Sequence, residues 1–115
     1  MLTPAANPIV TMLKGHVLAA YGLACIFAPV LEETMFRGAL FHHLRGRHSW
    51  FASAVAVALM FAIIHPQGWL AIPVLCSIAM VLAALREWRG SIIAPMAAHA
   101  FNNFIAITLA LALLS

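Results

Sequence analysis

The sequence predicts an all-α membrane protein, a polytopic helix bundle of about four transmembrane helices. The 115 residues are 65% hydrophobic and only 8% charged, with a mean hydropathy of +1.04. A soluble domain of this length needs far more polar surface around its core. The length allows one domain. We expect residues 1–13 to form a short interfacial lead-in and residues 14–115 to form the membrane core.

The first predicted membrane helix covers residues 15–44. At a rise of about 1.5 Å per residue, it is long enough to cross the bilayer with tilt and to extend past the hydrocarbon. Its sequence is free of Asp, Glu, Lys and Arg from His16 to Leu31, and Glu32, Glu33 and Arg37 then follow. A charge near the bilayer centre costs about 2.5 to 3.5 kcal/mol on insertion scales, so these three residues are functional candidates.

Two of these charges are expected to pair. Glu33 and Arg37 are spaced i,i+4, with the acid before the base, and therefore share one face of the helix. Glu32 points about 100° away, the rotation of one residue in a 3.6-residue turn. We predict that Arg37 neutralises Glu33 and that Glu32 faces another group.

Three further membrane helices follow. Residues 50–85 contain no Asp, Glu, Lys or Arg, a run too long for one ordinary span. The sequence His-Pro-Gln-Gly at 65–68 breaks it, because Pro and Gly end one helix and start another. The predicted helices are therefore a short one over residues 50–65, one over residues 69–85 and, after a loop at 86–90, one over residues 91–114.

The arginines predict the orientation of the bundle. Four of them fall in the expected loops 45–49 and 86–90, which lie on the same side if the helices alternate in direction. By the positive-inside rule that side is cytoplasmic. No basic stripe with interleaved aromatic residues is present, so nucleic acid is not an expected partner. The arginines are Arg45, Arg47, Arg86 and Arg89.

Polar side chains from three separate helices are expected to lie inside the membrane. They are Glu32, His65, and the i,i+4 pair His99 and Asn103, which share a helix face. Counted from the Arg-rich loops at about 1.5 Å per residue, the first three lie roughly 19, 24 and 14 Å deep. Tilt and kinks can absorb a spread of about 10 Å. We therefore expect one site, with Asn102 facing elsewhere as a packing group.

These residue types suit hydrolysis by either of two routes. In the first, a buried carboxylate takes a proton from water, a histidine donates to the leaving amine, and an asparagine amide stabilises an oxyanion. In the second, Glu32, His65 and His99 are ligands of a catalytic zinc that keeps an open position. The signature HExxH is absent, which weakens the zinc route. The sequence leaves zinc and no cofactor both open.

Three motifs in order resemble those of the CPBP intramembrane proteases, also known as CAAX proteases, bacteriocin-processing enzymes or the abortive-infection family. The family motifs are EExxxR, FxxxH and HxxxN. They match EETMFR at 32–37, FAIIH at 61–65 and HAFNN at 99–103. Each motif lies on its own apolar helix, with one helix between the second and the third. The resemblance covers residues 20–105.

The resemblance implies a multi-pass protein, expected in a bacterial cell membrane, that cleaves peptide bonds at or in the membrane. Eukaryotic relatives trim the last three residues from prenylated CAAX proteins, so lipid and a prenylated or leader-bearing peptide are the expected partners. Family members are often described as metalloproteases, and a metal-free glutamate and water mechanism is also proposed for them. They usually carry further helices before the first motif, so we expect a fragment, a wrongly assigned start site or a minimal version.

The resemblance also implies a role for each matched residue. Glu32 would activate the water and His65 would assist it. His99 and Asn103 would bind the developing oxyanion. The supporting residues would be Glu33, Arg37 and Phe61.

Other functions fit the same residues. The Glu33–Arg37 pair alone could simply fix helix packing. A noncatalytic membrane binding or immunity protein could use the same scaffold, although it would not need Glu32 together with both histidines. Buried acids and imidazoles could also form a proton or ion pathway, but polar groups confined to one depth speak against it.

Overall fold

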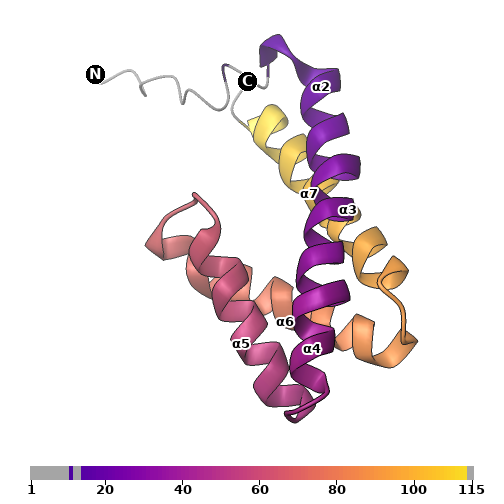
Figure 1. Ribbon diagram of the computed structural model, residues 1–115. Coiled ribbons are helices and arrows are strands. Elements are labelled where there is room, and N and C mark those ends of the chain that lie inside the picture. Colours follow the sequence, from indigo (N-terminus) through magenta and orange to yellow (C-terminus); the bar gives the residue numbers. More distant parts are fainter. Residues whose placement is uncertain (1–10, 12–13, 114–115) are drawn as a thin grey trace.

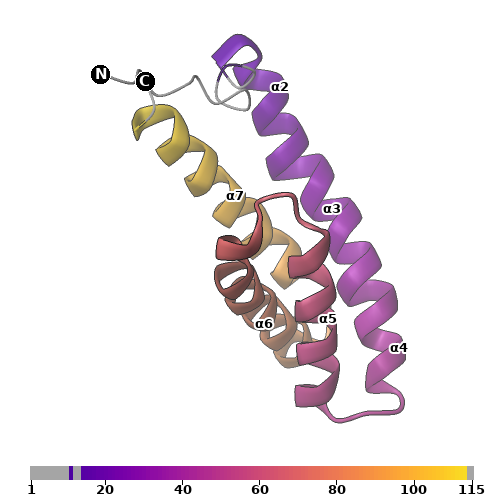
Figure 2. The same ribbon diagram turned by 90° about the vertical axis from the view of Figure 1, so that its left-hand side faces the viewer.

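The computed structural model describes residue 11 and residues 14–113, and the elements in this part of the chain are helical. The predicted lead-in over residues 1–13 lies outside the described residues except for Thr11. Figures 1 and 2 show a bundle in which α5 and α6 lie side by side, while α2 and α7 extend beyond them. This arrangement confirms the predicted all-α membrane helix bundle. Within the described residues, three helices are long and apolar enough to cross a membrane, and a fourth apolar helix is shorter.

The first long helix is continuous from Val17 to Arg45. It contains three α-helical parts separated by two π-helical ones, η1 and η2. Single π-helical turns in long helices are frequent at functional sites. Here the two π-helical parts flank α3, which carries both glutamates. The parts are α2 (Val17–Gly22), η1 (Leu23–Phe27), α3 (Ala28–Glu33), η2 (Thr34–Leu40) and α4 (Phe41–Arg45).

The second helix, α5 (Trp50–Ile64), begins at Ser49, whose hydroxyl accepts a hydrogen bond from the Ala52 amide at 3.2 Å. A serine at this position satisfies one of the free amides at a helix start. The helix ends at the predicted His-Pro-Gln-Gly turn. Gly68 has a φ of +85° there, a conformation that glycine adopts without steric cost.

A short 3-10 turn, η3 (Trp69–Ala71), leads into α6 (Ile72–Arg89), and α7 (Ile93–Leu113) follows. The predicted loop at 86–90 is wrong, because residues 86–89 form the last turn of α6. Gly90, with a φ of +63°, ends the helix. Basic side chains in a last turn are favourable because they face the negative end of the helix dipole, so the arginines of this segment do not mark a loop.

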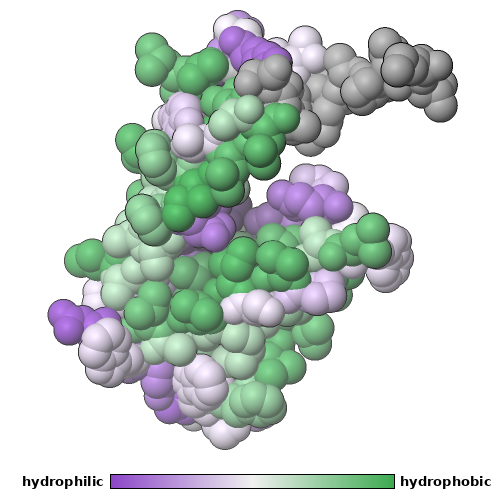
Figure 3. All heavy atoms as spheres, turned by 180° about the vertical axis from the view of Figure 1, so that it is seen from behind, coloured by the Kyte–Doolittle hydropathy of each residue, from purple (hydrophilic) through white to green (hydrophobic). Residues whose placement is uncertain are grey.

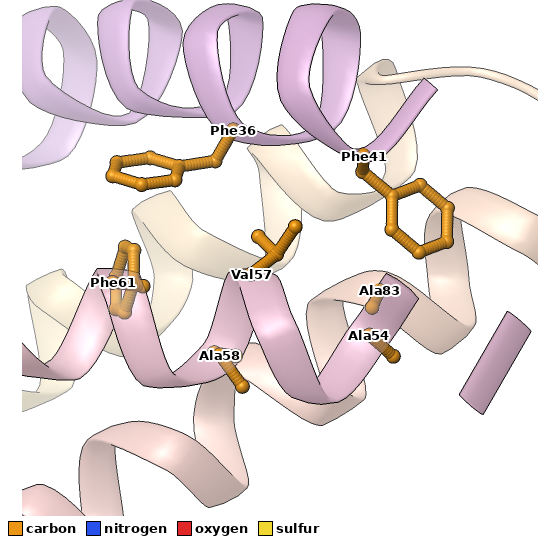
Figure 4. Close-up of a cluster of buried hydrophobic side chains, with 8 residues drawn as sticks. Phe36, Phe41, Ala54, Val57, Ala58, Phe61 and Ala83 are labelled. Carbon is orange, nitrogen blue, oxygen red and sulfur yellow. The ribbon is translucent and has the colours of Figure 1, made fainter. Parts of the chain in front are cut away.

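Small residues let the helices approach closely. The buried cluster in Figure 4 combines the aromatic side chains of Phe36, Phe41 and Phe61 with alanines of α5 and α6. Small residues at helix interfaces are the usual packing solution in lipid, where close van der Waals contact replaces the hydrophobic effect. The alanines are Ala54, Ala58, Ala79 and Ala83.

The length of α5 sets the depth of the turn that follows it. Its 15 residues span about 22 Å, whereas the hydrocarbon core is about 30 Å thick. A helix of this length is therefore about 8 Å too short to cross the hydrocarbon, so we expect the turn after it to lie inside the membrane if Ser49 lies at the opposite surface. Irregular backbone at such a depth is tolerated only inside protein or along a water-filled cavity.

We predict that Ala58→Leu destabilises the bundle by about 1 to 3 kcal/mol, because a larger side chain overpacks the α5–α6 contact. Ala58 is only 3% exposed. Ala52→Leu is the matched control, since Ala52 is exposed on the same helix. Unfolding in mixed detergent micelles measures both. Equal stability of the two variants would contradict the packing described here.

Candidate active site

The centre of the site is a buried ion pair. Arg37 Nη1 donates to Glu33 Oε1 at 2.9 Å, and both side chains are fully buried. Arg37 Nη2 donates to the carbonyl oxygen of Ala79 on α6 at 3.0 Å. The i,i+4 pair expected from the sequence is therefore present, and it also ties the first long helix to α6.

The same glutamate reaches α7. Glu33 Oε1 lies 2.7 Å from His99 Nδ1, and His99 is 3% exposed. Glu33 is paired with Arg37 and acts as a carboxylate acceptor, so His99 Nδ1 carries the proton of this hydrogen bond. The other ring nitrogen, Nε2, then faces away from Glu33.

Glu32 points to a different group, as its rotation on the helix predicts. Its Oε2 atom lies 3.4 Å from His99 Nε2 and 3.8 Å from His65 Nε2. This oxygen is buried and has no hydrogen-bond partner in the described part of the protein. The structure therefore brings Glu32, His65 and His99 together from three helices that are distant in sequence.

The ring of His65 is held in the same way as that of His99. Its Nδ1 atom bonds the backbone carbonyl oxygen of Phe61, and a carbonyl can only accept. Both histidines therefore donate a hydrogen bond from Nδ1–H to another protein group, and both present Nε2 to Glu32. In the neutral rings both Nε2 atoms are acceptors, so three acceptor atoms converge.

Phe61 holds the two rings in place. It is 2% exposed, and its ring lies 4.2 Å from that of His65 and 5.8 Å from that of His99, between ring centroids. The Arg37 guanidinium carbon lies 5.0 Å from the Phe61 ring centroid. A cation over an aromatic face adds electrostatic attraction. Phe61 thus fits a supporting role without chemistry of its own.

A cavity of about 400 Å³ opens onto Glu32, His65 and His99. Figure 3 shows hydrophilic residues within a notch of an otherwise largely hydrophobic surface. Asn103 also lines the cavity, and its Nδ2 atom donates to the Ala24 carbonyl oxygen at 2.7 Å. The amide has a second hydrogen, which this bond leaves free.

Asn102, expected to face elsewhere, lines this cavity and also a second one between α6 and α7. It follows His99 by three residues, and i,i+3 neighbours share a helix face just as i,i+4 neighbours do. That spacing is the sequence signal that identifies it. Gln67, in the turn after α5, is a second cavity residue without a predicted role.

The spacing of the candidate ligands matches a zinc site only in part. Among residues 11 and 14–113, no group of three or more His, Cys, Asp or Glu side chains is arranged to hold a metal ion. Tetrahedral zinc with bonds of about 2.1 Å keeps its donor atoms about 3.4 Å apart. The separation between Glu32 Oε2 and His99 Nε2 equals this value at 3.4 Å, whereas the separation between Glu32 Oε2 and His65 Nε2 is larger at 3.8 Å.

We predict that Arg37→Leu destabilises the protein by about 3 to 5 kcal/mol, because it leaves the buried Glu33 charge unpaired. The double variant Glu33→Gln/Arg37→Leu removes both charges and should regain part of this loss. Arg47→Leu, at an exposed position, is the matched control. Unfolding in mixed micelles measures all three, and a double variant no more stable than Arg37→Leu would contradict the assignment.

Comparison with known proteins confirms the resemblance drawn from the motifs. Residues 14–105 match the family of type II CAAX prenyl endopeptidase Rce1-like proteins. "Uncharacterized protein YpbD" of Bacillus subtilis (strain 168) is 35% identical over 68 residues, 59% of this chain and 33% of that protein. The match thus spans a third of the relative's length. No solved structure matches the chain. Because the family match includes all three motifs, the chain belongs to the Rce1-like family of type II CAAX prenyl endopeptidases.

Proposed function

We propose that the chain is an intramembrane endopeptidase that hydrolyses peptide bonds of a membrane-associated substrate with a water activated by Glu32. One observation carries this proposal. Glu32 Oε2 is a buried acceptor without a hydrogen-bond partner in the described residues, and it lies in a cavity beside two imidazole Nε2 atoms. A buried acceptor of this kind needs a donor. Water supplies one and is also the reactant.

In the proposed first step, the water is bound by Glu32 and His65. Their facing atoms are 3.8 Å apart, close enough for one water to reach both. Glu32 takes a proton as the water oxygen attacks the scissile carbonyl carbon. That proton then passes to the leaving nitrogen, so water and peptide become a carboxylic acid and an amine.

The developing negative charge on the carbonyl oxygen needs donors. We assign these to His99 and Asn103. His99 supplies Nε2–H in its protonated form, and Asn103 supplies the hydrogen not used on the Ala24 carbonyl. The bond from Nδ1 to Glu33 stabilises the protonated ring through a charge-assisted hydrogen bond. Glu33 and Arg37 therefore act by positioning His99.

The family description supports a substrate with a lipid-modified or otherwise membrane-held peptide. We propose a prenylated or leader-bearing chain. We further propose a bacterial cell membrane as the location, with the end of the bundle that carries the arginines on the cytoplasmic side. Two hydrogen bonds between Arg45 and Glu87 link the first long helix to α6 at this end. Arg45 Nε donates to Glu87 Oε2 at 3.0 Å, and Arg45 Nη2 donates to Glu87 Oε1 at 2.6 Å.

Glu32→Gln should lower peptide cleavage at least about 100-fold, because the amide cannot act as a general base. The measurement is cleavage of a quenched fluorescent peptide library in lipid nanodiscs, with metal content assayed on the same samples. Glu87→Gln is the matched control, since its side chain is 39% exposed and away from the site.

Two results would overturn the proposal. The first is full activity of Glu32→Gln. The second is a wild-type protein that folds normally and cleaves no member of the library, which would favour a noncatalytic role on this scaffold.

A further inference from the structure

Two carboxamide side chains of the cavity have no role in the proposed chemistry. Asn102 comes from α7, and Gln67 comes from the turn between α5 and α6. Neither side chain makes a hydrogen bond within the described residues. Gln67 is exposed and Asn102 is half-buried, so water in the cavity can pair with both amides until a ligand replaces it. Both amides are therefore available to a polar ligand that enters the cavity.

We propose that Asn102 and Gln67 form a subsite that binds the backbone of an extended peptide segment. A carboxamide offers two donors and one acceptor. These are the complement of the N–H and C=O of a peptide unit. The subsite rests on the proposed peptidase function and specifies the form in which the substrate is bound.

The proposed subsite selects an extended segment over a helical one. In a membrane helix each backbone N–H and C=O is bonded within the segment, which leaves none for a side-chain amide. An extended segment presents both groups. The substrate must therefore be unwound, or lack helical structure, where it enters the cavity.

The rest of the cavity lining is also compatible with an extended peptide substrate. Apart from the polar residues named above, it is formed by apolar side chains, several of them alanines. A wall of this kind leaves room for small apolar substrate side chains and provides little polar selectivity of its own. The backbone contacts then carry most of the polar recognition. These residues are Ala24, Ala28, Phe61, Leu75, Ile78, Ala106 and Ile107.

The cavity gives the segment a hydrated place to bind. Gln67 belongs to the turn after α5, a helix about 8 Å shorter than the hydrocarbon core is thick. Water in the cavity can bond a free peptide backbone until the two amides replace it. An extended segment therefore reaches the subsite without exposing its backbone to lipid.

The test measures binding, so that it does not depend on cleavage. The full chain carrying Glu32→Gln, in nanodiscs, is titrated with a pool of short fluorescein-labelled peptides of Ala, Val and Leu. Fluorescence anisotropy gives the dissociation constant. A matched pool with N-methylated backbone amides lacks the donors of the peptide backbone.

Adding Asn102→Leu, or Gln67→Met, should weaken binding of the unmodified pool by roughly threefold to tenfold, as expected for one lost hydrogen bond. In the Glu32→Gln parent, N-methylation should weaken binding similarly. It should have little further effect once Asn102 or Gln67 is replaced. Phe101→Leu is the control, because Phe101 is 66% exposed on the same helix and should bind like the parent.

A stability measurement separates binding from structure. Asn102→Leu should leave the unfolding temperature unchanged, whereas Asn103→Leu should lower it because the bond to Ala24 is lost. Unchanged peptide binding in both Asn102→Leu and Gln67→Met would overturn the subsite while leaving the proposed peptidase intact. If peptide binding depends on both amides but the wild-type protein cleaves no peptide, the subsite is supported and the peptidase function is rejected. Absence of peptide binding in the Glu32→Gln parent would overturn the subsite.

Discussion

The site depends on the buried ion pair between Glu33 and Arg37. Neither charge tolerates this environment alone, since breaking a buried pair leaves an uncompensated charge. The pair also does more than cancel charge. Through Ala79 it ties the first long helix to α6, and through His99 it ties that helix to α7. The hydrogen bond to His99 fixes which ring nitrogen is presented to Glu32. The same carboxylate therefore contributes both to helix packing and to the proposed chemistry.

A second constraint is the short length of α5. A 15-residue helix is shorter than the hydrocarbon core is thick, so we expect His65 at its end to lie inside the membrane, where an irregular turn must be shielded or hydrated. Figures 1 and 2 show α2 and α7 extending beyond this turn. The cavity thus lies next to the end of the short helix α5, where α2 and α7 continue beyond it. Water can reach Glu32 there, whereas the core on the other side of the site is filled by Phe36, Phe41 and alanines.

Those parts of the site that lie on a single helix were predictable from the sequence. The Glu33–Arg37 pair and the divergence of Glu32 follow from the 100° rotation per residue. The convergence of His65, His99 and Glu32 was an expectation only, because their depths counted along straight helices differed by about 10 Å. The angles at which the helices pack cannot be predicted from local sequence. The helical state of residues 86–89 was missed because charge was read as a sign of a loop. Asn102 was missed because only i,i+4 spacing was considered.

The most direct test is nitrogen-15 NMR of the histidine rings in nanodiscs. Because Glu33 and the Phe61 carbonyl both accept hydrogen bonds from Nδ1, we predict that His99 and His65 both carry a proton on Nδ1. Glu32→Gln leaves both Nδ1 hydrogen bonds in place, so both rings should keep the proton on Nδ1 in this variant. A bare Nδ1 on either ring would contradict this arrangement, because Nε2 would then carry the proton and the three acceptors would not converge on the water.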